Sequence, residues 1–288
     1  MNVDETRPEG QLVLVATPLG NLGDLSPRAL EFFRRADVIY CEDTRHSRVL
    51  FSANGIASGG RLQALHEHNE VAQSEHVVTR VREGQLVVLI SDAGTPGISD
   101  PGTRVVAAVA TAGLRVSTAP GPSAVVAALS ISGLPTERFI MEGFFPRKAN
   151  DRARLVASWA EEERTIVFYE SPQRLAGVLS ELAQTFPDRR VAVVRELTKL
   201  HEEVIRGTTR EVAAVLEQRV ILGEIVVVLE GGEPVIDVDD ELVRRALREQ
   251  FSTGVSTRDA VDFVSETLGA SHRVVYQMAL EVKKDATS

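Results

Sequence analysis

Short apolar runs that alternate with glycine-rich turns and helix-start signals fill the first 120 residues, and this pattern constrains the fold more than any other feature. The runs are Leu12–Ala16, Val38–Cys41, Leu86–Ile90 and Leu114–Thr118. Strands that are buried on both faces are almost continuously apolar, whereas strands with one exposed face alternate polar and apolar residues. Helices between successive strands cover both faces of such a sheet. The sequence therefore predicts an α/β fold with a parallel sheet.

Three residues that stand directly before a proline predict helix starts. Ser26, Asp100 and Ser171 have side chains that serve as N-caps, and the following proline fits the first helical position, where its missing N–H costs nothing. Gly113 predicts the end of the helix that follows Asp100, because glycine readily adopts the left-handed conformation common after a helix.

A second α/β segment begins after Pro120-Gly-Pro122, and 288 residues suffice for about two domains. Its candidate strands are Phe139–Phe145, Thr165–Tyr169, Val191–Arg195 and Ile225–Leu229. We divide the chain into a disordered tail (1–10), an N-terminal α/β domain (11–119), a C-terminal α/β domain (120–234) and a small helical extension (235–288).

The extension has a pattern similar to a helix-turn-helix. Residues 258–267 have helical spacing, Leu268-Gly-Ala270 predicts a turn, and a helix capped by Ser271 follows. Two helices joined by a three-residue turn with glycine occur in nucleic-acid-binding proteins, but a small helical cap without such contacts has the same pattern. Both interpretations stay open at this stage.

Composition excludes several classes of protein. The 32 basic and 41 acidic residues give a net charge of −9, which argues against a polycation that coats nucleic acid but allows one basic face. Cys41 is the only cysteine, so an intrachain disulfide and a cysteine-rich zinc site are excluded. We expect His66 and His68 to be structural and expect no metal site. No stretch approaches the roughly 18 apolar residues of a membrane span, and the polar N-terminus does not resemble a signal peptide, so we expect a cytoplasmic protein.

Two glycine-rich loops follow predicted strands and indicate a ligand site. Thr17–Asp24 contains two glycines, and Ser91–Gly102 contains three. Ligands of open α/β sheets bind beyond the carboxyl ends of the strands, and glycine lets a ligand approach the backbone closely. Neither loop matches the P-loop or the GxGxxG pattern, which disfavours an ATPase and a nicotinamide enzyme.

These two loops belong to a series of short sequence motifs along the chain. In order they are Ala16–Asp24 (ATPLGNLGD), Glu42–His46 (EDTRH), Ser91–Gly102 (SDAGTPGISDPG), Pro120–Ala124 (PGPSA), Gly133–Pro135 (GLP), Glu142–Pro146 (EGFFP), Phe168–Pro172 (FYESP) and Arg195–Lys199 (RELTK). Together they resemble the ribosomal RNA small-subunit methyltransferase I family of the tetrapyrrole methylase superfamily. The resemblance covers about residues 11–232 and continues more weakly in the extension.

The resemblance implies two α/β domains with S-adenosylmethionine between them. It also implies methylation of the ribose 2′-hydroxyl of a cytidine in the decoding region of 16S ribosomal RNA, in the small ribosomal subunit, by a homodimer. The cofactor contacts that it implies are Pro18, Leu19, Gly94, Thr95, Pro96, Ile98, Ser99, Ser123, Ala124, Tyr169 and Leu197.

Methyl transfer from a sulfonium has a good leaving group, so alignment of donor and acceptor supplies much of the acceleration. The acceptor hydroxyl still needs a proton acceptor or strong polarisation. Lys199 is a candidate base if it is desolvated, or else a phosphate contact. Asp43 is a candidate base, or else a salt-bridge partner that orients Arg45. We expect Asp100 to cap a helix rather than to contact the sulfonium.

A basic run from Arg147 to Arg154 follows Phe144-Phe145-Pro146 on a predicted loop. Aromatic side chains suit stacked bases, and neighbouring cations suit phosphates. Arg45 and Arg48, which follow the second strand, are also candidates for phosphate contacts. The predicted RNA-binding residues are Arg48, Arg147, Lys148, Arg152 and Arg154.

Two other functions remain open on the sequence alone. A methyltransferase of a small tetrapyrrole would share the glycine-rich loops, although the EDTRH and RELTK runs and the helical extension favour ribosomal RNA. A DNA-binding regulator would use the extension, but that function leaves the glycine-rich loops of the first domain unexplained.

Overall fold

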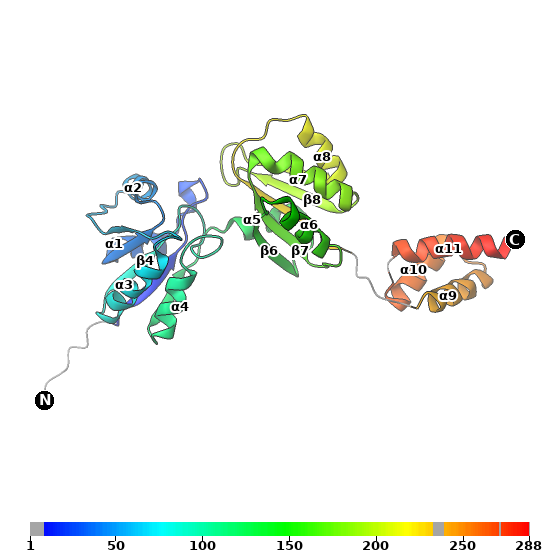
Figure 1. Ribbon diagram of the computed structural model, residues 1–288, viewed down its shortest axis with the longest axis horizontal. Helices are drawn as coiled ribbons and strands as arrows, with labels where there is room; N and C mark the ends of the chain where they lie inside the picture. The colour runs from blue at the N-terminus through cyan, green and yellow to red at the C-terminus, as the bar shows by residue number, and fades with distance from the viewer. Residues whose placement is uncertain (1–8, 233–238, 271, 288) are drawn as a thin grey trace.

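The computed structural model describes residues 9–232, 239–270 and 272–287 (Figure 1). Its first sheet contains β1 (Gln11–Val15), β2 (Val38–Cys41), β3 (Leu62–Ala64), β4 (Leu86–Leu89) and β5 (Arg115–Ala119). The strand order is β3-β2-β4-β1-β5, and every pairing is parallel. The predicted parallel sheet is confirmed. The edge strand β3 adds to the prediction, because its three residues carry no apolar run.

Helices cover both faces of this first sheet. They are α1 (Pro27–Arg35), α2 (Thr44–Ala53), α3 (Glu70–Arg82) and α4 (Thr103–Thr111), with a short 3-10 helix η1 (Leu22–Asp24) after β1. Neighbouring residues of β1 face opposite cores: Leu12 packs with residues of α3 and α4, whereas Val13 packs with residues of α1 and α2. The sheet is therefore buried on both sides, which explains the continuous apolar runs.

Two of the three predicted helix starts are confirmed. The Ser26 side chain accepts a hydrogen bond from a backbone N–H of α1, and Pro172 opens α7 (Pro172–Thr185) directly after Ser171. Gly113 follows α4 with a φ of +71°, as expected for the residue after a helix end.

The third start is wrong, because Asp100 does not cap a helix. Helix α4 begins at Thr103, and Gly102 holds the cap position. Glu70, a buried carboxylate of α3, accepts hydrogen bonds of 2.9 Å from the backbone N–H groups of Gly102 and Arg104. Because this distant carboxylate satisfies the helix N-terminus, Asp100 lies on the loop before it.

The second sheet is mixed. Its strands are β6 (Phe139–Phe144), β7 (Thr165–Glu170), β8 (Arg190–Arg195), β9 (Glu203–Thr208) and β10 (Ile225–Leu229). They lie in the order β6-β7-β10-β8-β9, and only β6 and β7 pair in parallel. All four predicted strands are present. The edge strand β9 is an addition, since Arg206 and Gly207 interrupt its apolar pattern.

Different elements cover the two faces of the second sheet. Helices α6 (Ala149–Ser158), α7 and α8 (Thr209–Glu217) pack on one face, around Phe168 and Val227 (Figure 1). The opposite face packs against α5 (Ala124–Ser132) and against Leu19, which comes from the loop after β1. A residue of the first domain thus completes the core of the second.

The C-terminal extension is a three-helix bundle, drawn apart from both sheets in Figure 1. It consists of α9 (Asp240–Ser252), α10 (Thr257–Leu268) and α11 (His272–Thr287), packed around Leu247, Val261 and Val275. Gly269 ends α10 in the left-handed conformation, so the predicted turn is present. The predicted Ser271 cap, most of the predicted N-terminal tail and part of the predicted linker lie outside the described residues. Within the described residues, no helix has the length and apolarity needed to cross a membrane.

Candidate cofactor-binding site

A cavity of about 390 Å³ lies between the loops of the first domain and the strand ends of the second. This volume falls in the range of roughly 300–1,000 Å³ that is typical of small-molecule sites. Nine of the eleven predicted cofactor contacts line it: Leu19, Gly94, Thr95, Ile98, Ser99, Ser123, Ala124, Tyr169 and Leu197. Pro18 and Pro96 are not among the lining residues, although each adjoins one in the chain. The cavity therefore brings together the motifs of both domains.

Other lining residues were not predicted as contacts. They are Asp92, Ala93, Asp100, Phe144, Glu170, Ser171, Pro172, Val194, Gly223, Glu224, Ile225 and Val226. Strand β10 is antiparallel to β7 and β8, and its first residue, Ile225, pairs with Glu170 and Arg195 at the ends of those strands. The start of β10 thus reaches the cavity, whereas a parallel strand would bring its end there. Tyr169, Ser171 and Pro172 belong to one motif, which was the available signal for the residues beside Tyr169.

Gly94 belongs to the first-domain wall of the cavity. Its φ is +84°, and a Cβ there would lie 3.2 Å from a methyl carbon of Leu19. The backbone of Gly94 forms two hydrogen bonds with that of Thr17, of 2.9 and 3.0 Å. The Thr95 hydroxyl donates to the carbonyl of Pro122 at 3.0 Å. These bonds fix the chain segments that follow β1, β4 and β5 to one another before any ligand arrives.

Carboxylates lie at one side of the cavity. Burial, together with the charge of Glu42, raises the pKa of Asp100 to about 6, and a hydrogen bond with Ser91 opposes this rise. Burial and the charge of Asp92 likewise raise the pKa of Glu42. Burial, followed by the charge of Asp100, raises the pKa of the Tyr169 hydroxyl. Asp100 is thus a carboxylate of the first domain that acts electrostatically on the second.

The EDTRH motif adjoins this carboxylate group. Asp92 accepts a hydrogen bond from the backbone N–H of Asp43 at 3.2 Å and lies 3.1 Å from Nδ1 of His46. Asp43 caps α2 and pairs with the Arg45 guanidinium at 2.7 Å. Hydrogen bonds from Arg45 hold the pKa of Asp43 well below its ordinary value. This geometry favours the salt-bridge interpretation of Asp43 over the base, since so weak a base accepts protons poorly.

Lys199 lies between two carboxylates of the second domain. Its Nζ is 2.9 Å from Oε1 of Glu196 and 2.9 Å from Oε2 of Glu224. Burial lowers the pKa of Lys199, but the hydrogen bonds to both carboxylates outweigh it, and the pKa lies above the ordinary value. A lysine that stays protonated cannot accept a proton, so the geometry disfavours the predicted base.

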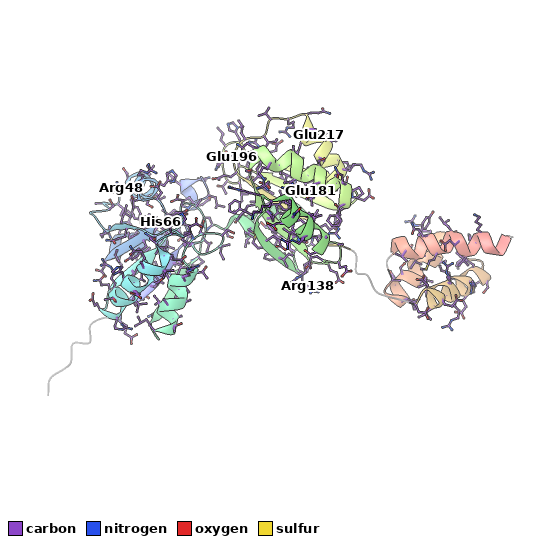
Figure 2. The ribbon with its side chains drawn as sticks, viewed as in Figure 1. Arg48, His66, Arg138, Glu181, Glu196 and Glu217 are labelled. Atoms are coloured by element: carbon purple, nitrogen blue, oxygen red, sulfur yellow. The ribbon has the colours of Figure 1, made fainter. Side chains whose placement is uncertain are left out.

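The Lys199 side chain also packs against Gly20 of the first domain. Gly20 has a φ of +134°, which favours glycine, and a Cβ there would lie 2.7 Å from Cγ and Cε of Lys199, so a side chain at this position would displace the lysine stem. Glu196, labelled in Figure 2, and Thr198 have φ values of +52° and +66°, which place Leu197 between them. Left-handed conformations of residues other than glycine are strained, and they persist only where the surrounding structure imposes them. The RELTK loop, which joins β8 to β9, therefore contacts the first domain in a fixed conformation.

The predicted RNA-binding residues lie outside the cavity and differ in their pairing. Arg152 pairs with Glu181 at 2.9 Å, and Arg154 pairs with Asp151. Arg147 and Lys148 are exposed on the loop before α6. Arg48, the remaining residue of the set, is exposed on α2 and is labelled in Figure 2.

The two histidines of the predicted structural pair lie near each other. The ring centroids of His66 and His68 are 5.9 Å apart. The described part of the chain contains no group of three or more potential metal ligands.

The chain is similar to known proteins in sequence and in fold. The family model of tetrapyrrole (corrin/porphyrin) methylases matches residues 11–213. A Synechocystis sp. protein named ribosomal RNA small subunit methyltransferase I is 41% identical over 280 residues, which cover 96% of this chain and 99% of that protein. A Xylella fastidiosa protein of the same name is 43% identical over 272 residues, with coverages of 93% and 98%.

Among solved structures, uroporphyrin-III-C-methyltransferase from Thermus thermophilus has a TM-score of 0.53 at 23% identity, and the match covers 76% of this chain and 94% of that one. This similarity supports the two-domain fold alone. Fold, cavity and relatives together define the class: an S-adenosylmethionine-dependent methyltransferase. The chain belongs to the tetrapyrrole methylase family and, within it, to the ribosomal RNA small subunit methyltransferase I group. The family and the fold class indicated by the motifs are confirmed.

Proposed function

We propose that this protein methylates the ribose 2′-oxygen of a cytidine in the decoding region of 16S ribosomal RNA, within the small ribosomal subunit. The observation that carries the proposal is the cavity, in which nine motif residues from both domains converge, in a chain similar to the named relatives over almost its whole length. We further propose that it acts in the cytoplasm, where its substrate lies, and as a homodimer.

The residues of the cavity fit S-adenosylmethionine. Gly94 lacks the Cβ that would crowd Leu19, so a ligand can lie against the backbone there. Leu197 and Tyr169 offer apolar surface for an adenine, and the carboxylates of Asp92 and Asp100 complement a cation. The eleven motif residues, with the two prolines stiffening their loops, would hold the cofactor. When bound, S-adenosylmethionine supplies a methyl group on a positively charged sulfur.

Asp100 is the proton acceptor that we assign. It lines the cavity, and its pKa of about 6 keeps it ionised at neutral pH while making it a stronger base than an ordinary aspartate. As the ribose oxygen gains its methyl group, the hydroxyl proton would pass to this carboxylate. Asp100 thereby replaces Lys199 and Asp43 as candidate base, because those two groups are tied up in ion pairs.

The basic residues take positioning and binding roles in this proposal. Lys199 holds the RELTK loop against Gly20 and keeps the domains at the spacing that the cofactor needs. Arg45, Arg48, Arg147 and Lys148 would contact phosphates, which position an RNA without reading its sequence. Arg152 and Arg154 would contribute less, because each already has a carboxylate partner.

Small ribosomal subunits from cells that lack the gene provide the test. The purified protein with S-adenosylmethionine should add one methyl group to a ribose of the 16S ribosomal RNA, located by nuclease digestion and mass spectrometry. Incubation with precorrin-type tetrapyrroles in parallel should give no product. Methylation of the tetrapyrrole alone, or of a base rather than a ribose, would contradict the proposal.

A further inference from the structure

An exposed aromatic ring stands at the cavity. Phe144 lines the cavity, yet 69% of its surface is accessible to solvent. Its ring packs on that of Tyr169, with centroids 5.2 Å apart and planes inclined by 53°. Phe145, the next residue, is 2% exposed and packs in the core with Trp159 and Phe168. The two adjacent phenylalanines therefore serve different purposes, and core packing explains only the second.

A β-bulge places Phe144 on the cavity face. Along β6, Met141 pairs with Val167, but Phe144 pairs with Tyr169, so β6 has one residue more than β7 between these pairs. Gly143, with a φ of +74°, lies within this irregular stretch. The extra residue reverses the alternation of the strand. Without it, Phe144 would point into the core, on the side of Ile140.

The surroundings of Phe144 suit a nucleobase with its attached phosphates. Ile98, which also lines the cavity, offers a second exposed apolar side chain. Arg147 and Lys148 follow within four residues and are exposed. Arg174 donates hydrogen bonds to the carbonyls of Phe145 and Pro146, which fixes the chain that connects the ring to the cations.

We propose that Phe144 is a stacking platform for the base of the nucleotide whose ribose is methylated at the cavity. The inference rests on the proposed function and names a binding residue for its substrate. An aromatic face binds any unstacked base, and removal of such a ring weakens binding by about 10-fold to 100-fold. The edge of the same base remains available to select cytidine.

The test compares Phe144→Ala and Phe144→Trp with the control Phe139→Ala. Phe139 is a partly exposed phenylalanine at the other end of β6 and does not line the cavity. We expect Phe144→Ala to lower kcat/KM for small ribosomal subunits by about 10-fold to 100-fold and to lower S-adenosylhomocysteine affinity in calorimetry far less. Phe144→Trp should retain most activity, and Phe139→Ala should match the wild type. Wild-type kcat/KM in Phe144→Ala, or an equal loss of S-adenosylhomocysteine affinity, would overturn the inference.

A second measurement separates this inference from the proposed function. The probe is a single-stranded RNA of the decoding-region sequence with a fluorescent cytidine analogue at the target position. Stacking on Phe144 should quench the fluorescence with the wild type and with Phe139→Ala but not with Phe144→Ala. Quenching that depends on Phe144, without methylation of subunits by the wild type, would refute the proposed methylation and leave the platform standing. No quenching by the wild type, or equal quenching by Phe144→Ala, would refute the platform itself.

Discussion

The two α/β domains contribute to the cavity in different ways. The parallel first sheet presents loops that follow β1, β4 and β5, and its walls are mainly glycine backbone and short side chains around Gly94 and Ser123. The mixed second sheet presents larger side chains, among them Tyr169 and Phe144. This contrast teaches that the first domain lines the cavity mainly with backbone and short side chains, whereas the second lines it with larger side chains. We therefore expect variants at Gly94 and Asp100 of the first domain to change cofactor binding or chemistry most, and variants at Phe144 and Lys148 of the second domain to change substrate use most.

The largest effect is expected for Asp100→Asn, which removes the assigned proton acceptor. We expect kcat to fall by about 10²-fold to 10⁴-fold, with S-adenosylhomocysteine affinity changed far less. In the wild type, kcat should fall as the pH drops below about 6, because protonated Asp100 cannot accept the hydroxyl proton. Single-turnover rates of the wild type and of Asp100→Asn from pH 5 to pH 8 measure the loss in the variant and the pH dependence of the wild type. An acid limb that persists in the variant would assign the proton to another group.

The same variant has a consequence for stability. Asp100 has a pKa of about 6 in the folded protein against an ordinary value of 3.8, so its ionised form is disfavoured by folding. Asp100 therefore does not reduce the free energy of unfolding below about pH 4, where it is protonated in both states. As the pH rises through 6, ionisation of Asp100 lowers the free energy of unfolding. Asp100→Asn should therefore be more stable than the wild type at pH 8, by roughly 1–3 kcal/mol. The difference should vanish in urea titrations at pH 4.

Next in size is Gly94→Val, which tests the backbone wall of the first domain. A branched side chain at a φ of +84°, with Leu19 at 3.2 Å, must enter the space assigned to the cofactor. We expect S-adenosylhomocysteine affinity to fall by about 100-fold or more in calorimetry. Gly113→Val is the matched control, because Gly113 has a similar φ of +71° but open space around it. Equal affinity losses in both variants would indicate a general folding defect instead.

Lys199→Met should have a smaller effect and sharpen the role of the RELTK loop. Methionine keeps an apolar stem across Gly20 but loses the ammonium that joins Glu196 to Glu224. We expect a loss of kcat/KM of about 5-fold to 10-fold, because these pairs are partly screened by solvent. The pH dependence of kcat should keep its acid limb near pH 6. Loss of that limb together with activity would restore Lys199 as the base.

The smallest effect is expected from the loop before α6. Lys148→Ser should weaken the binding of small ribosomal subunits by a few-fold and lower the salt dependence of the binding constant by about one counterion. Arg154→Ser should change both less, because Asp151 already neutralises Arg154. Filter binding at several salt concentrations gives both slopes. Equal effects of the two variants would argue that the pairing with Asp151 is irrelevant to RNA binding.

Much of the cavity was predictable because its motifs are local. Gly94, Ser123 and Tyr169 lie in runs whose order and spacing resemble a known family, and each run lies at or beyond the end of a strand. Leu197 was predictable from the same resemblance, whereas the sequence left two roles open for nearby Lys199, a base and a phosphate contact, and its ion pairs with Glu196 and Glu224 disfavour the base. The charge state of Lys199 depends on Glu224, which is 25 residues away in the chain and reaches it only in the folded protein.

The sequence by itself determined the alternation of strands and helices, the parallel first sheet and the glycine loops, because local residue patterns and backbone preferences specify these features. Only the tertiary structure decided which groups meet. Strand β10 is antiparallel to its neighbours, so the start of this strand reaches the cavity. The carboxylate of Glu70 accepts a hydrogen bond at the N-terminus of α4, and Asp100 lines the cavity instead of capping that helix. One extra residue in β6 separated Phe144 from Phe145. Strand direction, distant hydrogen bonds and register depend on contacts between segments far apart in the chain, and no local pattern encodes them.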